Sequence, residues 1–252
     1  MFTHIVSAWA TSNQVVLGQV KTDEKSNEIT AIPELLKLLN ISGCTVTIDA
    51  MGCQKEIARQ IVERDADYIL PVKQNQRTLY DELEALFSEL DQQPGQFNVD
   101  VHETCESGHG RHEVRRCTTT DLVETLKTCK DWAGLSTVIR IESERTADGK
   151  TTIEHRYAIS SHKALSAPEA LRSWRAHWGI ENGLHWVLDV AFREDDCRVR
   201  AGYAAQNLSV MRQQAVNLLN GIKDAKVGIK VRRQRAGWDH NFLLRVLTSG
   251  AM

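Results

Sequence analysis

The feature that most constrains the fold is an alternation of strand-like and helix-like segments between residues 45 and 90. The run TVTID (45–49) is apolar up to its final aspartate, and YILPVK (68–73) is a second run of the same kind. Apolar residues at helical spacing fill 54–64 between them, and another helix is predicted at about 76–90. Strands and helices in this order predict a parallel α/β layer.

A hairpin is predicted before this layer and a mostly β segment after it. Residues 5–10 and 15–20 have the composition of two strands joined by a polar turn, and 30–39 that of an amphipathic helix. Short β-like runs recur from 91 to 160, which predicts a β-rich insertion.

Two helices are predicted after the insertion. Ser166 and Glu169 have the spacing of a capping box, and the helix they begin is expected to run to about residue 190. A second helix is predicted at about 203–220. The expected parts of the chain are a first core segment (1–90), the insertion (91–160), core helices (161–220) and a basic C-terminal segment (221–252).

Composition is that of a globular protein with a sizeable core. The chain has 252 residues, of which 42% are hydrophobic and 25% charged. Its formal net charge of -2 means that nucleic-acid binding would have to come from local patches. No apolar run approaches the roughly 20 residues that span a membrane, and the first residues lack a signal-peptide pattern. We therefore expect a cytoplasmic protein with no membrane partner.

The cysteines give no sign of a disulfide framework. There are six, none in a CxxC pair, so reduced thiols are expected. His102, Cys105, His109 and His112 lie within eleven residues and could be drawn as a zinc site. Their spacing fits no standard zinc motif, so a polar hairpin or a DNA-facing loop is the favoured interpretation.

Polar residues follow both strands of the predicted parallel layer. Asp49 ends the first strand and Lys73 ends the second, and sites in open α/β sheets form at the carboxyl ends of strands. Asp49 is either a functional carboxylate or the N-cap of the helix that follows. Lys73 begins the polar run KQNQ (73–76), which suits phosphate contact but is also typical of a solvated strand end.

The predicted long helix carries an unusual stripe of ionisable residues flanked by Trp174 and Trp178. The stripe recurs every four residues and consists of His177, Glu181, His185 and Asp189. A solvated face with His–carboxylate pairs is the ordinary interpretation. The alternative is that Glu181 acts with Asp49, because two carboxylates on separate rigid elements can share divalent metal ions for phosphodiester chemistry.

Two basic groups are suited to bind a phosphate backbone. The predicted hairpin tip GHGRH (108–112) is followed by Arg115 and Arg116. From Gly221 to the end there are seven Lys or Arg residues against two Asp. Such patches neutralise phosphates without reading sequence, although basic tails are commonly just solvated.

Taken together, these residues resemble the DDE transposases of bacterial insertion sequences, in particular the branch of the H-repeat-associated proteins. The likeness covers essentially the whole chain. The matching stretches are 20–30, 47–54, 73–76, 108–111, 177–182 and 184–189.

The resemblance implies an α/β fold, namely a ribonuclease-H-like mixed sheet flanked by helices, with a mostly β insertion before the long catalytic helix. It implies a DNA transposase that performs metal-dependent phosphodiester cleavage and strand transfer at the ends of an insertion sequence. Two Mg²⁺ or Mn²⁺ ions would be held by an Asp-Asp-Glu triad. The implied partners are double-stranded DNA, as terminal repeats and target, and further copies of the chain in a nucleoid-associated homo-oligomer.

The resemblance also assigns roles to individual residues. Asp49 matches the second triad Asp and Glu181 the triad Glu, which makes both catalytic residues and metal ligands. His177 falls where related transposases often have Arg, and Leu188 where many have Lys. The implied DNA-binding residues are Lys73, Asn75, His109, Arg111, His177, Lys230, Arg232, Arg233 and Arg235.

The first triad Asp has no counterpart in this sequence. In the family it ends a central strand just upstream of the opening hairpin, so that strand is expected to be missing, which would leave two unpaired strand edges in the core. Asp23 and Glu24 are poor substitutes because they follow the far strand of the hairpin. The open hypotheses are a transposase truncated at its start, a catalytically inactive remnant that retains DNA binding, a stand-alone metal nuclease and an unfolded product.

Overall fold

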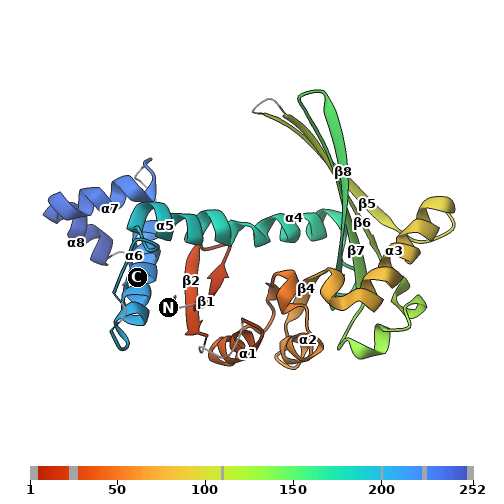
Figure 1. The fold of residues 1–252 in the computed structure, drawn as a ribbon, viewed down its shortest axis with the longest axis horizontal. Helices are drawn as coiled ribbons and strands as arrows, with labels where there is room; N and C mark the ends of the chain where they lie inside the picture. The colour runs from red at the N-terminus through yellow and green to blue at the C-terminus, as the bar shows by residue number, and fades with distance from the viewer. Residues whose placement is uncertain (1–4, 23–27, 109–110, 200, 223–225, 249–252) are drawn as a thin grey trace. The chain divides into compact units, whose positions relative to one another are not determined.

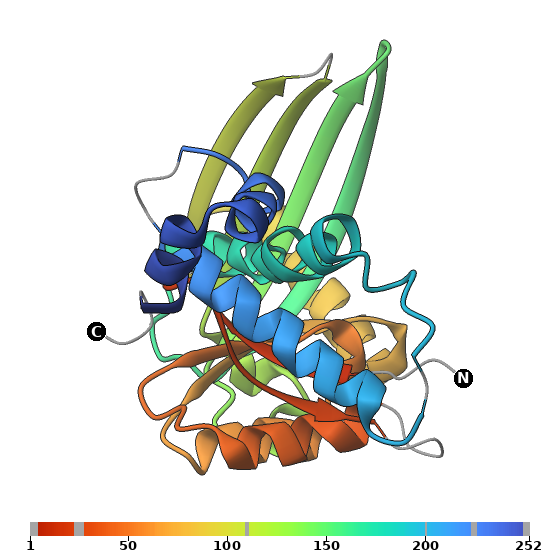
Figure 2. The ribbon, with the colours of Figure 1, turned by 90° about the vertical axis from the view of Figure 1, so that its left-hand side faces the viewer.

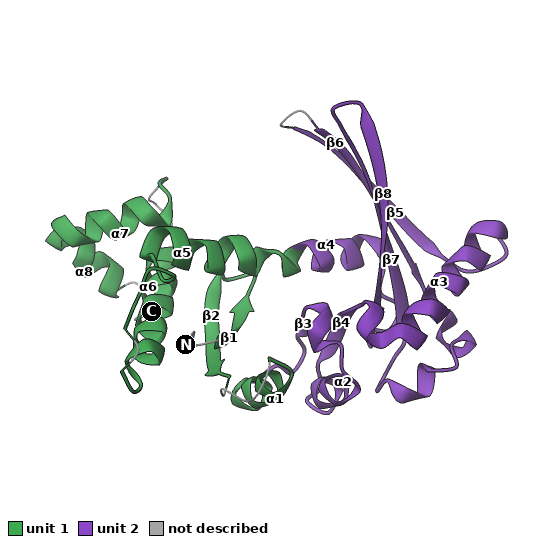
Figure 3. Ribbon diagram, viewed as in Figure 1, with its two compact units in different colours: residues 1–39, 176–252 green, residues 40–175 purple. Residues whose placement is uncertain are grey.

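The chain is mixed α/β and divides into two compact units. The computed structural model describes residues 5–22, 28–108, 111–199, 201–222 and 226–248. Unit 1 comprises Met1–Leu39 and Ala176–Met252, and unit 2 comprises Asn40–Arg175 (Figure 3). The six-stranded mixed sheet of unit 2, flanked by helices, is compatible with a ribonuclease-H-like fold.

The sheet of unit 2 has the order β3-β4-β8-β7-β6-β5 (Figure 1). β3 and β4 run parallel, as the sequence predicts, and each of the other neighbouring pairs is antiparallel. The strands are β3 (Thr45–Thr47), β4 (Asp67–Val72), β5 (Asp100–Gly108), β6 (Arg111–Thr120), β7 (Thr137–Ala147) and β8 (Lys150–Ser160).

Helices cover both faces of this sheet. Helix α3 (Arg77–Gln92) buries Phe87 against Tyr157, with the two rings stacked at 5.7 Å. The next residue of β8, Ala158, points to the opposite face and packs with Leu171 of α4 (Ala167–His177). Helix α2 (Lys55–Val62) connects β3 to β4. The inner ends of the strands are therefore enclosed between helices.

The outer ends of the same strands lie outside this core. In β8 the four residues 157–160 are buried, whereas 150–155 are exposed. β6 and β7 show the same division, and Figure 1 shows β5–β8 continuing together beyond α3. A row of ion-pairing and hydrogen-bonded side chains crosses all four strands, formed by Glu103, Arg116, Glu142 and His155.

Unit 1 is built on an antiparallel hairpin of two strands, β1 (Ile5–Ala10) and β2 (Val15–Lys21). Helix α1 (Glu28–Leu38) packs on one face, where Leu35 lies 3.5 Å from the Cβ position of Gly18. The other helices of the unit are the π-turn η5 (Glu181–His185), α5 (Trp186–Phe192), α6 (Ala204–Gly221), α7 (Ile229–Trp238) and α8 (His240–Thr248).

The capping box predicted for the long helix is confirmed in one of its two hydrogen bonds, that from the Ser166 backbone to the Glu169 carboxylate. The Ser166 hydroxyl donates to Glu169 Oε2 at 2.6 Å, and the Ser166 backbone N–H donates to the same oxygen at 3.3 Å. These hydrogen bonds hold the pKa of Glu169 below its usual range. The helix that begins here is not continuous to residue 190, because α4 ends at His177 and the π-turn precedes α5.

Amide side chains of α6 bind the outer edge of the hairpin, across which α6 runs in Figure 2. Asn217 Oδ1 accepts from the Val16 backbone N–H at 2.7 Å, and Asn217 Nδ2 donates to the Val16 carbonyl at 2.9 Å. Gln213 donates to the Ser7 hydroxyl and Asn220 to the Gln14 carbonyl. Asn217 thus satisfies both backbone groups of a strand residue as a neighbouring strand would.

Replacing Asn217 with alanine is expected to lower the free energy of unfolding by about 1–3 kcal/mol, because it leaves two partly buried backbone groups without partners. Urea unfolding followed by circular dichroism measures the loss. Asn220→Ala is the matched control, since its amide makes one exposed hydrogen bond to Gln14. Equal losses for the two variants would contradict this role of Asn217.

Among the described residues, none of the helices has the length and apolar character that crossing a bilayer requires.

Candidate functional site

Asp49 is exposed just beyond the carboxyl end of β3. The strand ends at Thr47, and Asp49 caps the 3-10 turn Ala50–Gly52, with its Oδ1 accepting from the Gly52 N–H at 3.2 Å. Helix α2 begins only at Lys55. The capping interpretation therefore holds for the short turn and not for the α-helix, and the cap occupies Oδ1 while the side chain stays open to solvent.

The polar run after β4 supports the loop that carries Asp49. β3 and β4 are parallel, so their carboxyl ends share one edge of the sheet, and Lys73 is exposed directly after β4. Asn75 Nδ2 donates to the Ala50 carbonyl at 2.7 Å, and Gln76 Nε2 donates to the Cys53 carbonyl at 2.9 Å. The Asn75 amide group that was expected to contact DNA is therefore already bonded to the Ala50 carbonyl. The sequence did not indicate this hydrogen bond.

Glu181 is the first residue of the π-turn in unit 1. Its side chain is exposed, and Oε2 lies 3.5 Å from His185 Nδ1. Its carbonyl accepts the Trp186 N–H, five residues ahead. Asp189 lies further along the exposed face, where desolvation and the neighbouring Asp195 and Glu194 carboxylates raise its pKa. The predicted stripe is thus confirmed where Glu181 meets His185.

His177 is the last residue of α4 and its ring contacts Trp178 edge-on, with the ring centroids 5.9 Å apart. Trp178 is half exposed. This pair presents an imidazole and an indole just before the π-turn.

Asp49 and Glu181 have the donor chemistry that Mg²⁺ and Mn²⁺ take. Both are exposed carboxylates, which offer hard oxygen ligands. The first belongs to unit 2 and the second to unit 1. The described part of the chain contains no group of three or more His, Cys, Asp or Glu side chains placed to hold a metal ion.

The residues weighed for zinc do not converge within the described residues. His102 and Cys105 are an odd number of positions apart on β5, so they point to opposite faces of the sheet. The His112 ring bonds the Ser107 hydroxyl across the hairpin at 2.8 Å. His109 lies outside the described residues. The polar hairpin is therefore the interpretation that fits.

The basic hairpin and the C-terminal arginines are largely engaged in contacts of their own. Arg116 is paired with Glu103 and Glu142, while Arg111 is exposed at the start of β6. Arg232 Nη1 donates to the Leu219 carbonyl at 3.0 Å.

Two further arginines of α7 lie over aromatic rings. The Arg233 guanidinium is 5.2 Å from the Phe192 ring centroid. Arg235 is 4.5 Å from that of Phe242 and is also paired with Asp239. Lys230 is exposed on the same helix. The expected basic tail instead folds into the helices α7 and α8, and arginine–aromatic contacts help to hold α7 in place.

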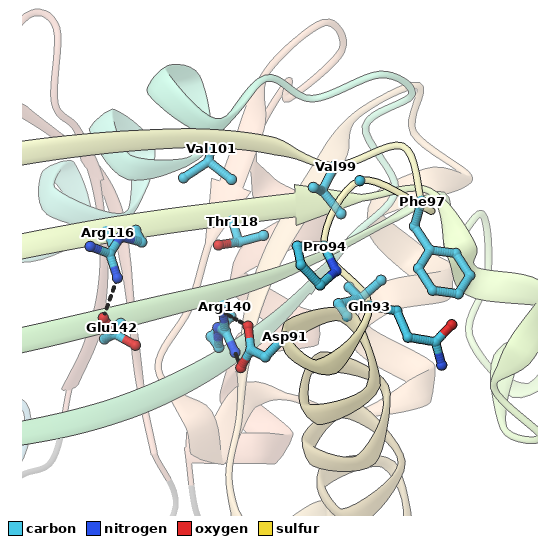
Figure 4. A pocket seen from close by; sticks show the side chains of 12 residues that line it. Asp91, Gln93, Pro94, Phe97, Val99, Val101, Arg116, Thr118, Arg140 and Glu142 are labelled. Atoms are coloured by element: carbon cyan, nitrogen blue, oxygen red, sulfur yellow. Dashed lines mark hydrogen bonds and ion pairs between the residues drawn. The ribbon is translucent and has the colours of Figure 1, made fainter.

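A pocket of about 420 Å³ lies in unit 2, between the end of α3 and the β5–β7 face (Figure 4). Its floor is the Arg140 guanidinium, which is bonded by both Nη atoms to Asp91 at 2.6 and 2.8 Å. Val101 and Phe97 are among its apolar lining residues. The lining contains none of the predicted site residues, so the pocket is separate from them.

The Asp91–Arg140 pair predicts an acid-dependent contribution to stability. Hydrogen bonds from Arg140 hold the pKa of Asp91 below its ordinary value of 3.8. A carboxylate whose pKa is lowered by folding contributes its full stabilisation at pH values above its ordinary pKa. That stabilisation is lost as the pH falls through the lowered pKa of the folded state. Asp91→Asn is therefore expected to destabilise at pH 6, with a deficit that shrinks below about pH 4.

Urea unfolding at a series of pH values measures this deficit. Asp81→Asn is the control on the same helix, because Asp81 makes only an exposed contact of 3.7 Å to Arg77. A deficit in Asp91→Asn that is independent of pH would count against the assignment.

Comparisons with known proteins give a consistent result. The family model described as "Transposase DDE domain" matches residues 1–218. The chain is 40% identical over 99% of its length to "H repeat-associated putative transposase YhhI" of Escherichia coli K12. It is 42% identical over 98% of its length to "Putative transposase YncI" of Escherichia coli O157:H7. It spans 66% and 63% of these two relatives.

Proposed function

The chain belongs to the DDE transposase domain family, and on that premise we propose that it cleaves and joins DNA at the ends of a mobile element. The observation that carries the proposal is the family match over residues 1–218, which includes both Asp49 and Glu181. The exposure of both carboxylates supports it, because metal ions and a DNA backbone must reach them from solvent.

Asp49 and Glu181 are the residues that would hold two Mg²⁺ or Mn²⁺ ions in this proposal. Such ions, when bound, activate an attacking water or 3′-hydroxyl and stabilise the leaving oxygen of a phosphodiester. Asn75 and Gln76 hold the loop that carries Asp49, and His185 lies against the Glu181 carboxylate. Lys73, on the same sheet edge as Asp49, offers a cation to a DNA phosphate.

We also propose a ribonuclease-H-like core in which residues 91–160 form an insertion. The parallel β3–β4 pair and the consecutive antiparallel strands β5–β8 support this division. Active assemblies would contain more than one copy of the chain, with double-stranded DNA of the element ends and of the target as substrate.

The proposed DNA-binding side chains fall into two groups, those that are exposed and those that already contact other groups of the protein. Lys73, Arg111 and Lys230 are exposed and carry the electrostatic part. Five other side chains would contact DNA while they keep the contacts described above, namely Asn75, His177, Arg232, Arg233 and Arg235. His109 belongs to the same proposed set.

Lys230→Ala is expected to weaken duplex binding by a similar factor for all sequences, since an exposed lysine neutralises phosphate and reads no bases. The slope of log affinity against log salt should fall by about one. Fluorescence anisotropy at several salt concentrations measures both. Lys37→Ala is the control, because this lysine is paired with Glu34 on α1. An unchanged slope in Lys230→Ala would remove it from the interface.

The experiment that tests the proposed function is incubation of the full chain with supercoiled plasmid in Mg²⁺, in Mn²⁺ and in EDTA. Nicked or linear products that require the divalent ion support the proposal. Salt-sensitive DNA binding without any cleavage would instead assign the chain a non-catalytic DNA-binding role. If the chain neither binds nor cleaves DNA, the catalytic role and the non-catalytic DNA-binding role are both refuted.

A further inference from the structure

The helix that carries Glu181 contains a π-turn at that residue. Glu181–His185 forms the turn, the Trp186 N–H donates to the Glu181 carbonyl, and α5 follows directly. A π-turn makes i→i+5 hydrogen bonds and occurs mostly as a single irregular turn, frequently at functional sites. Some contact in unit 1 must therefore favour it over a regular helical turn.

An indole ring lies directly against the backbone of this turn. A Cβ atom at Gly183 would be 2.9 Å from Trp9 Cζ2 and 3.5 Å from both Cε2 and Cη2. Real Cβ contacts essentially never reach 2.9 Å, so the ring occupies the space that any side chain at Gly183 would need. Glycine is required here by the close approach of Trp9.

Trp9 is itself held firmly by the hairpin. It lies opposite Val16 across the strand pair, next to a register shift that leaves Leu17 unpaired. Both backbone groups of Val16 are bonded to Asn217, so Trp9 and Val16 form a non-hydrogen-bonded pair, whose side chains are close. Bulges of this kind re-aim side chains next to active sites.

The residue after Gly183 adds a second contact between the turn and the hairpin. Leu184 is fully buried and packs in one cluster with Val16, Val187 and Trp9. The hairpin therefore contacts the π-turn twice, through Trp9 on the backbone of Gly183 and through Val16 beside Leu184. Glu181, on the exposed side of the same turn, has no freedom to rotate about the helix without displacing these contacts.

We propose that Trp9 is a positioning residue for Glu181: its indole, seated on Gly183, maintains the π-turn and so sets the direction in which the Glu181 carboxylate leaves the helix. The importance of that direction rests on the proposed function, in which Glu181 is a metal ligand. The packing itself is independent of it.

The test compares three variants of the full chain. Gly183→Ala places a methyl group against the indole. Gly179→Ala is the matched control, because the same substitution in the same helix meets Thr11 Cγ2 at an ordinary 3.6 Å. The double variant Gly183→Ala with Trp9→Phe removes the ring atoms that the methyl group would strike, and the methyl group takes the space they leave, so that the packing which maintains the turn is kept. Alanine favours the helix equally at both glycines, so a difference between the single variants reports the contact.

The primary readout is amide hydrogen exchange of Trp186, measured by NMR, because that N–H closes the π-turn. Exchange should be at least about tenfold faster in Gly183→Ala, on the scale of an overpacking penalty. It should stay near the wild-type rate in Gly179→Ala and return to within about threefold of it in the double variant. The Ile159 amide serves as a check that unit 2 remains folded.

A wild-type exchange rate in Gly183→Ala, or faster exchange that Trp9→Phe does not correct, would overturn the proposal. The plasmid assay on the same variants separates this inference from the proposed function. If the wild-type chain cleaves DNA, cleavage should fall in Gly183→Ala and recover in the double variant, and full activity in Gly183→Ala would overturn the positioning role. If the wild-type chain does not cleave, the proposed function fails and exchange alone decides the role of Trp9.

Discussion

Replacing Glu181 with glutamine is expected to reduce metal-dependent DNA cleavage by at least about a thousandfold, because a metal ligand contributes several kcal/mol of charge stabilisation in the transition state. The amide keeps the size of the side chain and removes its charge. Since Glu181 is exposed, the folded structure should be unaffected. Single-turnover plasmid cleavage in Mg²⁺ measures the loss. Asp196→Asn is the control, an exposed carboxylate of unit 1 paired only on the surface with Arg193.

Asp49→Asn sharpens the same test, because Asp49 has two separable roles. Asparagine keeps the oxygen that accepts from Gly52, and it is as good an N-cap as aspartate. Stability should therefore be preserved while cleavage falls as in Glu181→Gln. Cleavage that survives both substitutions would show that these carboxylates do not hold the catalytic ions.

Replacing Phe87 with alanine is expected to lower the free energy of unfolding by about 3–5 kcal/mol, the usual cost of truncating a buried aromatic residue. Phe87 is fully buried. It stacks on Tyr157 at 5.7 Å and lies 5.1 Å beneath the Arg140 guanidinium. Its loss would remove one of the contacts that join α3 to the sheet and would leave Arg140 over a cavity.

Urea unfolding monitored by circular dichroism measures this loss. Glu84→Ala is the control on α3, since Glu84 is exposed and alanine suits the helix equally at both positions. A loss below about 1 kcal/mol in Phe87→Ala would mean that the site collapses without cost and that α3 is held by other contacts.

The elements with clear apolar periodicity could be predicted from the sequence. The first strand was expected at 5–10 and is observed as Ile5–Ala10. The second helix after the insertion was expected at 203–220 and is observed as Ala204–Gly221. Each of these segments packs one face inside its unit, and the apolar residues of that face recur in the sequence at the spacing of a strand or a helix.

The outer ends of the insertion strands could not be predicted in the same way. The sequence indicated only short β-like runs between 91 and 160, whereas β6 and β7 extend over Arg111–Thr120 and Thr137–Ala147. Their outer halves are polar on both faces, so no alternation marks them. Cross-strand ion pairs such as Arg116–Glu142 stabilise them instead, and a partner on another strand is not visible locally.

The same limit explains what was missed in the candidate site. The sequence from Glu181 to His185 has ordinary helical spacing, and the residue that favours a π-turn there, Trp9, is distant in the chain. Helix α7 was not predicted because it has no buried residue and hence no apolar period. Its arginines therefore indicated a solvated DNA-binding tail, although Arg233 and Arg235 contact aromatic rings.

The β7–β8 hairpin can change length without disturbing the core. Its pairing runs without a shift from Thr137↔Ser160 to Ala147↔Lys150, and its turn is Asp148-Gly149 with positive φ at both residues. Removing two residues from each strand next to the turn would preserve the turn geometry and every inner pair. Removing one residue from a single strand would reverse all side chains beyond it. Homologous chains can therefore vary this hairpin in paired steps, and its reach is free to evolve separately from the fold.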